Sequence, residues 1–290
     1  MNNVKGFPPQ VFIIGAQKSG TTQLAALLDQ HTDICLSSPK EPDFFTRHFN
    51  KGLDWYKSCF FDTTKCLIDA STSYSCRPLP NIYPDDVNRQ NNPMIGVPQR
   101  IHQVSPNARL IYIVRDPIKR TYSSYWHQVR AGIETAPLDS AILKNTYYRR
   151  ISKYAEQMAY YLEYFDPEQI LLLDFEQLIK SPHDEINKCL VFLGLVPLAH
   201  IQTDVHKNKS FQYSGLLNIL NVKLAKFGGL KPISQIMKRI LPDIVVELLK
   251  GKMAKPIPQI TDAQKKLLAS QFDEEVAKVK MLLNNAKQDN

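Results

Sequence analysis

The chain has 290 residues, of which 43% are hydrophobic and 10% aromatic, which is enough for one sizeable folded core. Its formal net charge of +8 suits a polyanionic cofactor, an acidic glycan, a nucleic acid or an anionic membrane surface, and charge alone does not choose among them. The sequence has no internal repeat and no basic run with interleaved stacking aromatics, so nucleic-acid binding is not expected.

Targeting and redox features point to one compartment. Residues 1–9, before the first apolar run, include no segment as long as a signal sequence or a membrane span. The five cysteines are odd in number and lack metal-ligand spacing, which favours reduced thiols. The seven histidines are scattered, so no metal site is expected. These features predict a cytoplasmic location.

Residues 11–31 predict a strand, a loop and a helix. The sequence VFIIGAQKSGTT at 11–22 begins with an apolar run and continues into a polar turn bounded by Gly15 and Gly20. Leucines recur at helical spacing within 23–31, so one face of the helix can lie on a sheet. The free N–H groups and positive dipole end of such a helix bind phosphate or sulfate, which predicts an anion-binding loop.

The loop differs from that of nucleoside triphosphatases. The spacing of Gly15 and Gly20 matches a Walker A loop, but Thr21 and Thr22 follow where that motif has Lys and then Ser or Thr. The lysine is Lys18, inside the loop, beside the 5′ phosphate side of a nucleotide rather than its γ-phosphate. This pattern argues against triphosphate hydrolysis. For this segment alone, an ordinary strand-to-helix turn with a surface lysine is the alternative.

A second strand and helix carry another group of anion-binding residues. Residues 109–114 are an apolar strand, and residues 118–131 predict a helix with Asp116 as its N-cap. Arg115 ends the strand, and Ser123 lies two turns into the helix. A guanidinium and a hydroxyl together suit a terminal phosphate, because guanidinium can bind two oxygens at once. Either residue alone is better read as a surface charge or a helix filler.

Together, the two segments resemble the sulfotransferases that use 3′-phosphoadenosine 5′-phosphosulfate. The family's 5′-phosphosulfate loop is similar to residues 17–22, and its 3′-phosphate motif is similar to the Arg115 and Ser123 pair. The resemblance implies that this donor, whose product is adenosine 3′,5′-bisphosphate, is the cofactor and that no metal is used. The cofactor-binding residues implied by these segments are Gln17, Lys18, Ser19, Gly20, Thr21, Thr22, Arg115 and Ser123.

A third segment narrows the resemblance to the heparan sulfate sulfotransferases and their bacterial relatives. It reads SPKEPDFF at 38–45, followed by GLDWY at 52–56. The branch's catalytic glutamate carries over to Glu41, which would take the acceptor's proton, with Lys18 as the second catalytic residue. Without the resemblance, Glu41 is a solvated glutamate in a Pro-rich loop. Glycan-modifying relatives commonly have His at the position of Asp43, which puts the acceptor contacts in doubt.

Two further segments complete the implied site. Residues 69–74 sit where relatives have an acid, a lysine or small residue and a hydroxyl, and Ala70 removes a lysine that heparan-type members use. Residues 207–213 resemble the late basic loop over the 3′ phosphate and adenine, although relatives often have Gly at position 210. The resemblance adds Lys209, Ser210, Phe211 and Tyr213 to the cofactor set, and Asp43, His48, Ser71 and Tyr154 as substrate contacts.

The expected fold is a single α/β domain over residues 1–290. It has a central, mostly parallel sheet, a P-loop-like phosphosulfate loop and helices on both faces, with the cofactor at the carboxyl ends of the strands. Further expected elements are a helix over 149–165, a buried strand over 170–174, a helical stretch over 185–193 and a terminal helix over 260–283.

Residues 216–255 match the family poorly and are basic and amphipathic. Three interpretations stay open for this segment. It can form helices packed on the core, a lid over the acceptor, or a surface that rests on anionic lipid and makes a peripheral membrane contact.

The expected reaction is in-line transfer of a sulfonate group to a hydroxyl or amine of a small metabolite or natural product. A carbohydrate or a lipid-linked acceptor is the alternative for the same chemistry. Two other classes remain: a P-loop kinase or NTPase, for which Asp69 could supply a magnesium ligand, and a non-catalytic module that binds anionic ligands.

Overall fold

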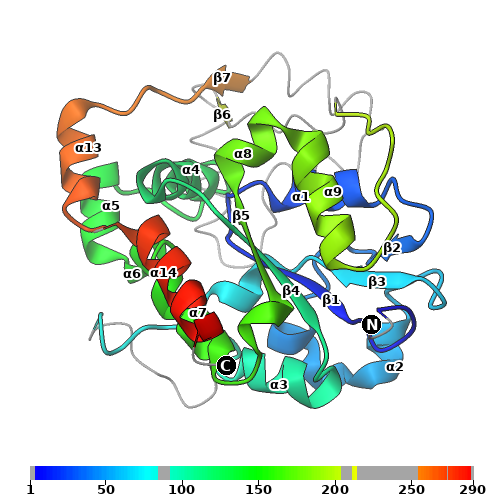
Figure 1. Ribbon diagram of the computed structural model, residues 1–290. Helices are drawn as coiled ribbons and strands as arrows, with labels where there is room; N and C mark the ends of the chain where they lie inside the picture. The colour runs from blue at the N-terminus through cyan, green and yellow to red at the C-terminus, as the bar shows by residue number, and fades with distance from the viewer. Residues whose placement is uncertain (1–3, 84–91, 204–210, 214–253, 273, 289–290) are drawn as a thin grey trace, which may run out of the picture. The chain divides into compact units, whose positions relative to one another are not determined.

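The computed structural model describes residues 4–83, 92–203, 211–213, 254–272 and 274–288 (Figure 1). The chain divides into two compact units. The first comprises Met1–Arg120, Arg149–Lys207 and Phe272–Asn290, and the second comprises Thr121–Tyr148 and Asn208–Gln271. The packing within each unit does not test the single domain expected over 1–290, which stays a prediction.

A five-stranded parallel sheet forms the centre of the first unit, with the strand order β2-β3-β1-β4-β5. In register, Phe12 of β1 lies opposite Asp69 of β3 and Leu110 of β4. Because all five strands run in the same direction, the loops after their carboxyl ends meet at one edge of the sheet. The strands are β1 (Val11–Gly15), β2 (Ile34–Leu36), β3 (Cys66–Asp69), β4 (Arg109–Val114) and β5 (Ile170–Asp174).

The helices of the first unit are mostly short. Among the described residues, four short elements of other helical types lie between them: the π-helix η1 and the 3₁₀ turn η2, which precede α2, and the 3₁₀ turns η3 and η4, which follow β3 and precede β5. In chain order these elements are α1 (Thr21–Leu28), η1 (Phe44–His48), η2 (Phe49–Lys51), α2 (Gly52–Lys57), η3 (Thr72–Ser75), α3 (Val97–Val104), α7 (Tyr154–Leu162), η4 (Pro167–Gln169), α8 (Phe175–Lys180), α9 (Pro182–Phe192) and α14 (Glu275–Gln288).

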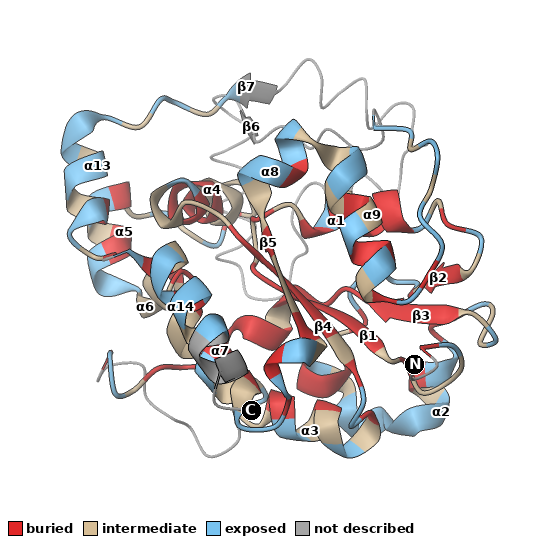
Figure 2. Cartoon of the chain, viewed as in Figure 1, coloured by how far each residue is buried: buried red, intermediate tan, exposed pale blue. Residues whose placement is uncertain are grey.

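Both faces of the sheet are covered, as the sequence predicts. Val11 points into an apolar cluster with the leucines of α1 and α9. Phe12 points to the opposite face, where its ring lies 5.6 Å from that of Phe45, and Tyr112 meets Tyr154 of α7 on this face. The strands β1, β3 and β4 are therefore buried almost throughout (Figure 2), which is typical of a parallel sheet between two helical layers.

The second unit contains most of α4 (Pro117–Arg130), because the boundary between the units falls inside this helix. It also contains an antiparallel pair of strands. Two tyrosines of α4 form hydrogen bonds with other segments of this unit: Tyr122 donates to Pro258 O at 2.7 Å, and Tyr125 donates to Ala136 O at 2.9 Å. The other elements are α5 (Leu138–Lys144), α6 (Thr146–Arg150), which crosses the boundary, β6 (Phe211–Tyr213), β7 (Ala254–Pro256) and α13 (Asp262–Ala269).

The predicted fold class is confirmed, and two predicted helices are corrected. The helix expected over 149–165 is interrupted at 151–153, where Ser152 is fully buried and accepts a hydrogen bond from Arg120 Nε. The terminal helix expected over 260–283 is divided into α13 and α14, and Glu274 between them has a φ of 46°. Most of the basic segment 216–255 lies outside the described residues.

Among the residues that the structure describes, no helix is both long and apolar enough to span a membrane. All five cysteines of the chain are buried and free: Cys35, Cys59, Cys66, Cys76 and Cys189.

Candidate active site

The loop between β1 and α1 is shaped by close backbone packing. Gly20 has a φ of 89°, and a Cβ there would lie 2.8 Å from the ring of Phe175, so only glycine fits. A Cβ at Gly15 would lie 2.1 Å from Ser75 Oγ. Lys18, between the two glycines, also has a positive φ, of 70°. The loop therefore keeps its backbone close to β4, β5 and the segment after β3.

The first turn of α1 is open to an anion. Gly20 is the N-cap and has no side chain to cap the helix. The first backbone N–H of the helix that donates to a preceding carbonyl is that of Leu24, which donates to Gly20 O at 3.0 Å. Within the described part of the chain, the N–H groups of Thr21, Thr22 and Gln23 are thus the free donors of this turn. Together with the helix dipole they suit a phosphate or sulfate, as the sequence predicts.

Arg115 lies directly beside this loop. Its Nη1 donates to Lys18 O at 3.0 Å, and its guanidinium stacks on Phe175 at 4.4 Å from the ring centre. The backbone of Arg115 is fixed as well, because Tyr154 donates from its hydroxyl to Arg115 O at 2.8 Å. Burial lowers the pKa of Arg115, so its positive charge is poorly solvated. Phe175 thus touches both halves of the expected anion site.

One donor of Arg115 tests whether these residues fit the doubly phosphorylated cofactor. Arg115 Nε is buried and has no acceptor among the described residues. A buried donor of a cation without a partner is costly, and an anionic oxygen would satisfy it. The open first turn of α1 and this unused donor therefore fit a ligand that carries negative charge at two places.

Glu41 is held by two neighbours. Its Oε2 accepts from Thr72 Oγ1 at 2.9 Å and from Thr72 N at 3.3 Å, and its Oε1 pairs with Lys40 Nζ at 2.8 Å. Burial opposes ionisation of this carboxyl, but the Lys40 ammonium and the Thr72 hydrogen bonds outweigh it and lower the pKa of Glu41. The group is ionised at neutral pH, and 39% of its side chain is exposed, so it can accept a proton from an incoming molecule.

The segment around Asp43 is tied to the residues after β3. Asp43 N donates to Ser71 Oγ at 3.0 Å, and Ser73 Oγ donates to Asp43 Oδ1 at 2.6 Å. Arg47 lies 3.5 Å from Asp43 Oδ2. Residues 41–43 and 71–73, far apart in the sequence, therefore form one hydrogen-bonded unit beside the loop of β1.

Known proteins match most of the length of this chain. The model of the sulfotransferase domain family matches residues 8–226. The chain belongs to the sulfotransferase family. It is 30% identical over 285 residues to a bifunctional heparan sulfate N-deacetylase/N-sulfotransferase of Drosophila melanogaster, covering 87% of this chain and 27% of that protein. It is 29% identical over 243 residues to heparan sulfate glucosamine 3-O-sulfotransferase 6 of Homo sapiens, covering 77% of this chain and 61% of that protein.

The fold comparison agrees with the family. A crystal structure of a sulfotransferase from Alicyclobacillus acidocaldarius matches with a TM-score of 0.57 and 25% identity, covering 75% of this chain and 92% of that one. The predicted family and enzyme class are thus confirmed at the level of the domain. This sulfotransferase chain spans only 27% and 61% of the two curated relatives named above.

The substrate contacts predicted from the sequence lie in different surroundings. Ser71 and Tyr154 are fully buried, and their hydroxyls bond to Asp69 and to the Arg115 backbone, which favours structural roles. His48 packs edge-on to Trp55 with ring centres 5.1 Å apart, and burial together with Lys51 lowers its pKa. Among the described contacts, none joins His48 to Glu41. Only Asp43 of this set is close to Glu41 and partly accessible.

The remaining cofactor residues are not brought to the loop by any described contact. Ser123 is buried on α4 in the second unit, and Phe211 and Tyr213 are the ends of β6. Lys209 and Ser210 lie outside the described residues. The roles of these five residues stay predictions.

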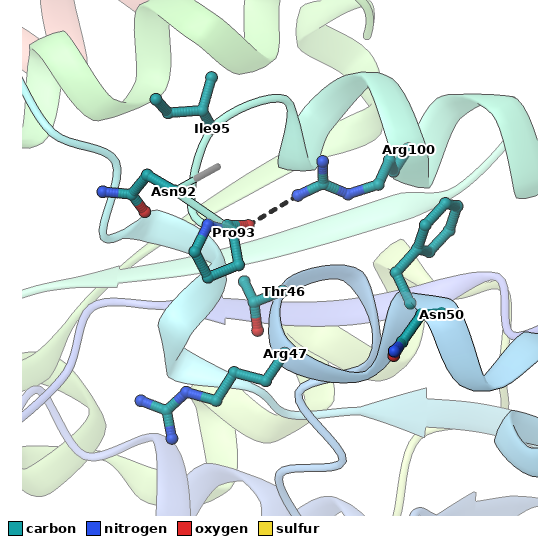
Figure 3. Close-up of a pocket in the computed structure, with 8 residues that line it drawn as sticks. Thr46, Arg47, Asn50, Asn92, Pro93, Ile95 and Arg100 are labelled. Atoms are coloured by element: carbon teal, nitrogen blue, oxygen red, sulfur yellow. Dashed lines mark hydrogen bonds between the residues drawn. The ribbon is translucent and has the colours of Figure 1, made fainter. Parts of the chain in front are cut away.

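A cavity of about 620 Å³ opens between η1 and the start of α3 (Figure 3). Arg100 donates from Nε to Phe45 O at 2.8 Å and from Nη2 to Pro93 O at 2.7 Å, the bond drawn in Figure 3. No carboxylate of the described residues pairs with Arg100, and burial lowers its pKa. Polar and apolar groups share the wall, which is formed by Thr46, Arg47, Phe49, Asn50, Asn92, Pro93, Ile95 and Arg100.

Sequence reasoning missed three contributors to the site. Phe175 supports both Gly20 and Arg115, Thr72 holds Glu41, and Lys40 pairs with Glu41. The sequence positions of two of these residues could have indicated a role in the site. Phe175 directly follows a predicted buried strand, and Thr72 is part of a run of hydroxyl residues that follows the acid at the end of another.

Proposed function

We propose that this chain transfers a sulfonate group from 3′-phosphoadenosine 5′-phosphosulfate to a hydroxyl or amine of a small acceptor. The observation that carries the proposal is the hydrogen bond from Arg115 Nη1 to Lys18 O at 3.0 Å, beside the open first turn of α1. It joins two anion-binding elements at one edge of the sheet, as a donor with phosphates at both its 3′ and 5′ positions requires.

The residues around this contact have distinct tasks in the proposed reaction. N–H groups of the first turn of α1 and the ammonium of Lys18 hold the 5′ phosphate and stabilise the charge that grows on the leaving oxygen. Arg115 binds the 3′ phosphate, with Ser123 and Lys209 as further predicted contacts. When bound, the donor supplies an activated sulfonate whose leaving group is adenosine 3′,5′-bisphosphate.

Glu41 is the proposed general base. As the acceptor oxygen or nitrogen attacks sulfur, its proton passes to a Glu41 carboxylate oxygen, and the bond from sulfur to the leaving oxygen breaks. Thr72 and Lys40 keep the carboxylate ionised before the transfer. The lowered pKa of Glu41 makes it a weak base, so it acts on a proton that becomes acidic as the new bond to sulfur forms.

The acceptor is proposed to be a small metabolite or natural product, because Asp43 and Ala70 stand where heparan-type relatives have His and Lys. A sugar acceptor is the second candidate, favoured by two relatives that are named for heparan sulfate. The cavity beside η1 supports either, since its arginines and asparagines can bind hydroxyl or acidic groups while Phe49 and Ile95 contact a ring.

Calorimetry with adenosine 3′,5′-bisphosphate, compared with ATP plus magnesium, tests the donor. The bisphosphate is expected to bind and ATP to bind much more weakly. Tight binding of ATP without binding of the bisphosphate would favour the kinase alternative, although fully enclosed Asp69 does not fit as its magnesium ligand. Incubation of a cell extract with the donor, followed by a search for metabolites that gain a sulfonate, identifies the acceptor. A cytoplasmic location stays a prediction that cell fractionation can test.

A further inference from the structure

A buried carboxylate lies next to the segment that carries Glu41. Asp69, the last residue of β3, is fully buried and accepts four hydrogen bonds. Its Oδ2 accepts from the hydroxyls of Tyr56 and Tyr74, both at 2.6 Å. Its Oδ1 accepts from Ser71 Oγ at 2.6 Å and from Ser71 N at 3.0 Å. In the described part of the chain no cation neutralises it, so hydroxyl and amide donors alone hold this charge.

Two of these hydroxyls are bonded on both sides. Ser71 Oγ donates to Asp69 and accepts from the N–H of Asp43 at 3.0 Å. Tyr74 donates to Asp69 and accepts from the N–H of Phe45 at 3.3 Å. The direction of both chains is fixed, because an ionised carboxylate only accepts and a backbone N–H only donates. Each hydroxyl must therefore give its proton to Asp69 and offer a lone pair to the backbone of residues 43–45.

We propose, on the basis of the proposed sulfotransferase function, that Asp69 is the positioning residue for Glu41. Its negative charge orients the hydroxyls of Ser71 and Tyr74 so that they hold the backbone that follows Glu41. The same segment also binds Glu41 directly, since Thr72, next to Ser71, donates twice to its Oε2. Two contacts from Thr72 thus hold the base, and one each from Ser71 and Tyr74 hold the backbone that follows it. Asp69 orders these three residues from the opposite side.

Loss of the charge would disturb one of the two chains. A protonated or amidated Asp69 presents a donor at one of its two terminal positions, which meets Ser71 Oγ and N on the Oδ1 side or the hydroxyls of Tyr56 and Tyr74 on the Oδ2 side. Hydrogen bonds that this position accepts in the ionised state are then lost. Burial raises the pKa of Asp69 to about 6, although the hydrogen bonds from Ser71, Tyr56 and Tyr74 oppose the rise. The loop is therefore ordered above this pH and loosened below it.

Four other titratable groups around Asp69 do not change charge in this range. They are the hydroxyls of Tyr56, Tyr74 and Tyr161 and the thiol of Cys59, and burial raises the pKa of each, so all four are neutral. Glu41 has a lowered pKa and stays ionised near pH 6. An acid limb of activity near pH 6 thus separates Asp69 from Glu41. The Asp69→Asn variant separates it from His48 of η1, an imidazole whose pKa is lowered by burial and by Lys51.

The chain offers a matched pair of variants. Tyr56→Phe and Tyr74→Phe each remove one hydroxyl that lies 2.6 Å from Asp69 Oδ2, and each keeps its ring. Only the hydroxyl of Tyr74 passes a contact on to the loop, at Phe45 N; among the described residues, that of Tyr56 bonds to Asp69 alone. If loss of any hydrogen bond to Asp69 loosens the loop, both variants show the effect. If the loop depends on the hydroxyl that links Asp69 to Phe45 N, only Tyr74→Phe shows it.

Hydrogen exchange on the full chain, read by mass spectrometry, tests the proposal without an acceptor. Peptides from 41–48 are expected to exchange roughly tenfold faster in Tyr74→Phe and in Asp69→Asn than in wild type. Tyr56→Phe is expected to stay near wild type there, and peptides from β4 are expected to be unchanged in all three variants. Equal acceleration in the two tyrosine variants, or acceleration that spreads to β4, would overturn the proposal.

Hydrolysis of the donor, with water as acceptor, supplies the second readout. The wild-type rate is expected to fall below about pH 6, and in Asp69→Asn the remaining rate loses this limb while affinity for adenosine 3′,5′-bisphosphate stays within about twofold. An unchanged acid limb in Asp69→Asn would contradict the role of Asp69. If wild type neither binds the bisphosphate nor hydrolyses the donor, the proposed function fails, and the exchange experiment still decides whether Asp69 orders the loop.

Discussion

Arg115 and Lys18 meet through one hydrogen bond, from Arg115 Nη1 to Lys18 O at 3.0 Å. The contact uses the backbone carbonyl of Lys18 and not its side chain. It also uses one of the five N–H donors of Arg115, and Nε remains buried without an acceptor in the described structure. The arginine thus both supports the loop and keeps a donor for an anion.

Arg115→Lys is expected to weaken binding of adenosine 3′,5′-bisphosphate by about 10- to 100-fold. An ammonium cannot hold Lys18 O and a phosphate with the planar geometry of guanidinium, and it stacks less well on Phe175. Calorimetry measures the change. Arg47→Lys, on the exposed side of η1, is the matched control and is expected to leave this affinity unaltered. Equal effects of the two variants would argue against a cofactor role for Arg115.

Gly20→Ala tests the packing of the loop. The new Cβ would lie 2.8 Å from the Phe175 ring at a φ of 89°, so both a clash and backbone strain are expected. Gly52→Ala is the control for strain alone, because Gly52 has a φ of 77° and nothing lies within 4 Å of its Cβ position.

The free energy of unfolding in urea is expected to drop by about 1–2 kcal/mol for Gly52→Ala and by about 1–3 kcal/mol more for Gly20→Ala. Phe175→Leu should recover part of the additional loss, since it removes the ring that the Cβ meets. If the two alanine variants lose the same stability, the clash with Phe175 is not real.

Glu41→Gln is expected to lower turnover by about 100- to 10,000-fold, because the amide cannot take the acceptor's proton. Binding of adenosine 3′,5′-bisphosphate should stay at the wild-type value. Thr72→Val is the graded comparison: it removes the hydroxyl that positions Glu41 Oε2, while Thr72 N and Lys40 still hold the carboxylate, so a smaller loss of turnover is expected. Near-normal turnover of Glu41→Gln would show that another group is the base.

Lys18→Met probes the charge inside the loop. The ammonium is removed while the length of the side chain is nearly kept, so about 3–4 kcal/mol of transition-state stabilisation is expected to be lost. Turnover should fall by orders of magnitude, and the melting temperature should stay close to that of wild type. A large drop in melting temperature with little change in turnover would assign Lys18 a structural role.

Local sequence patterns determined the strands and the anion-binding loop but not the contacts between segments. The strands Arg109–Val114 and Ile170–Asp174 match the prediction residue for residue, because their apolar runs end at polar residues. The break of the helix expected over 149–165 depends on Arg120, whose Nε bonds to Ser152 across the fold. Propensity carries no information about such a tertiary partner.

The same limit applies to the site. Glu41 could be assigned from its motif, but Thr72, which holds its Oε2, follows β3 and is adjacent to it only after the parallel sheet has formed. Phe175 was missed for this reason too, since its contacts with Gly20 and Arg115 bring the ends of three strands together. Residues that position a functional group through the fold leave weaker sequence signals than the group itself.

The buried charge of Asp69 predicts an unusual dependence of stability on pH. Burial raises the pKa of this carboxyl from 3.8 to about 6, so the folded state binds its proton more tightly than the unfolded state does. Its contribution to the free energy of unfolding therefore increases as the pH falls from about 6 to about 4, by about 3 kcal/mol in all.

Urea unfolding of wild type and Asp69→Asn at about pH 7 and about pH 4 measures this contribution, because carboxyls common to both proteins cancel in the difference. Wild type is expected to gain stability relative to Asp69→Asn on acidification. A difference that stays constant would mean that the hydroxyls of Tyr56, Tyr74 and Ser71 stabilise the carboxylate as much as burial destabilises it, and a change in favour of Asp69→Asn would mean that they stabilise it more. In that case an acid limb of activity near pH 6 could not be assigned to Asp69.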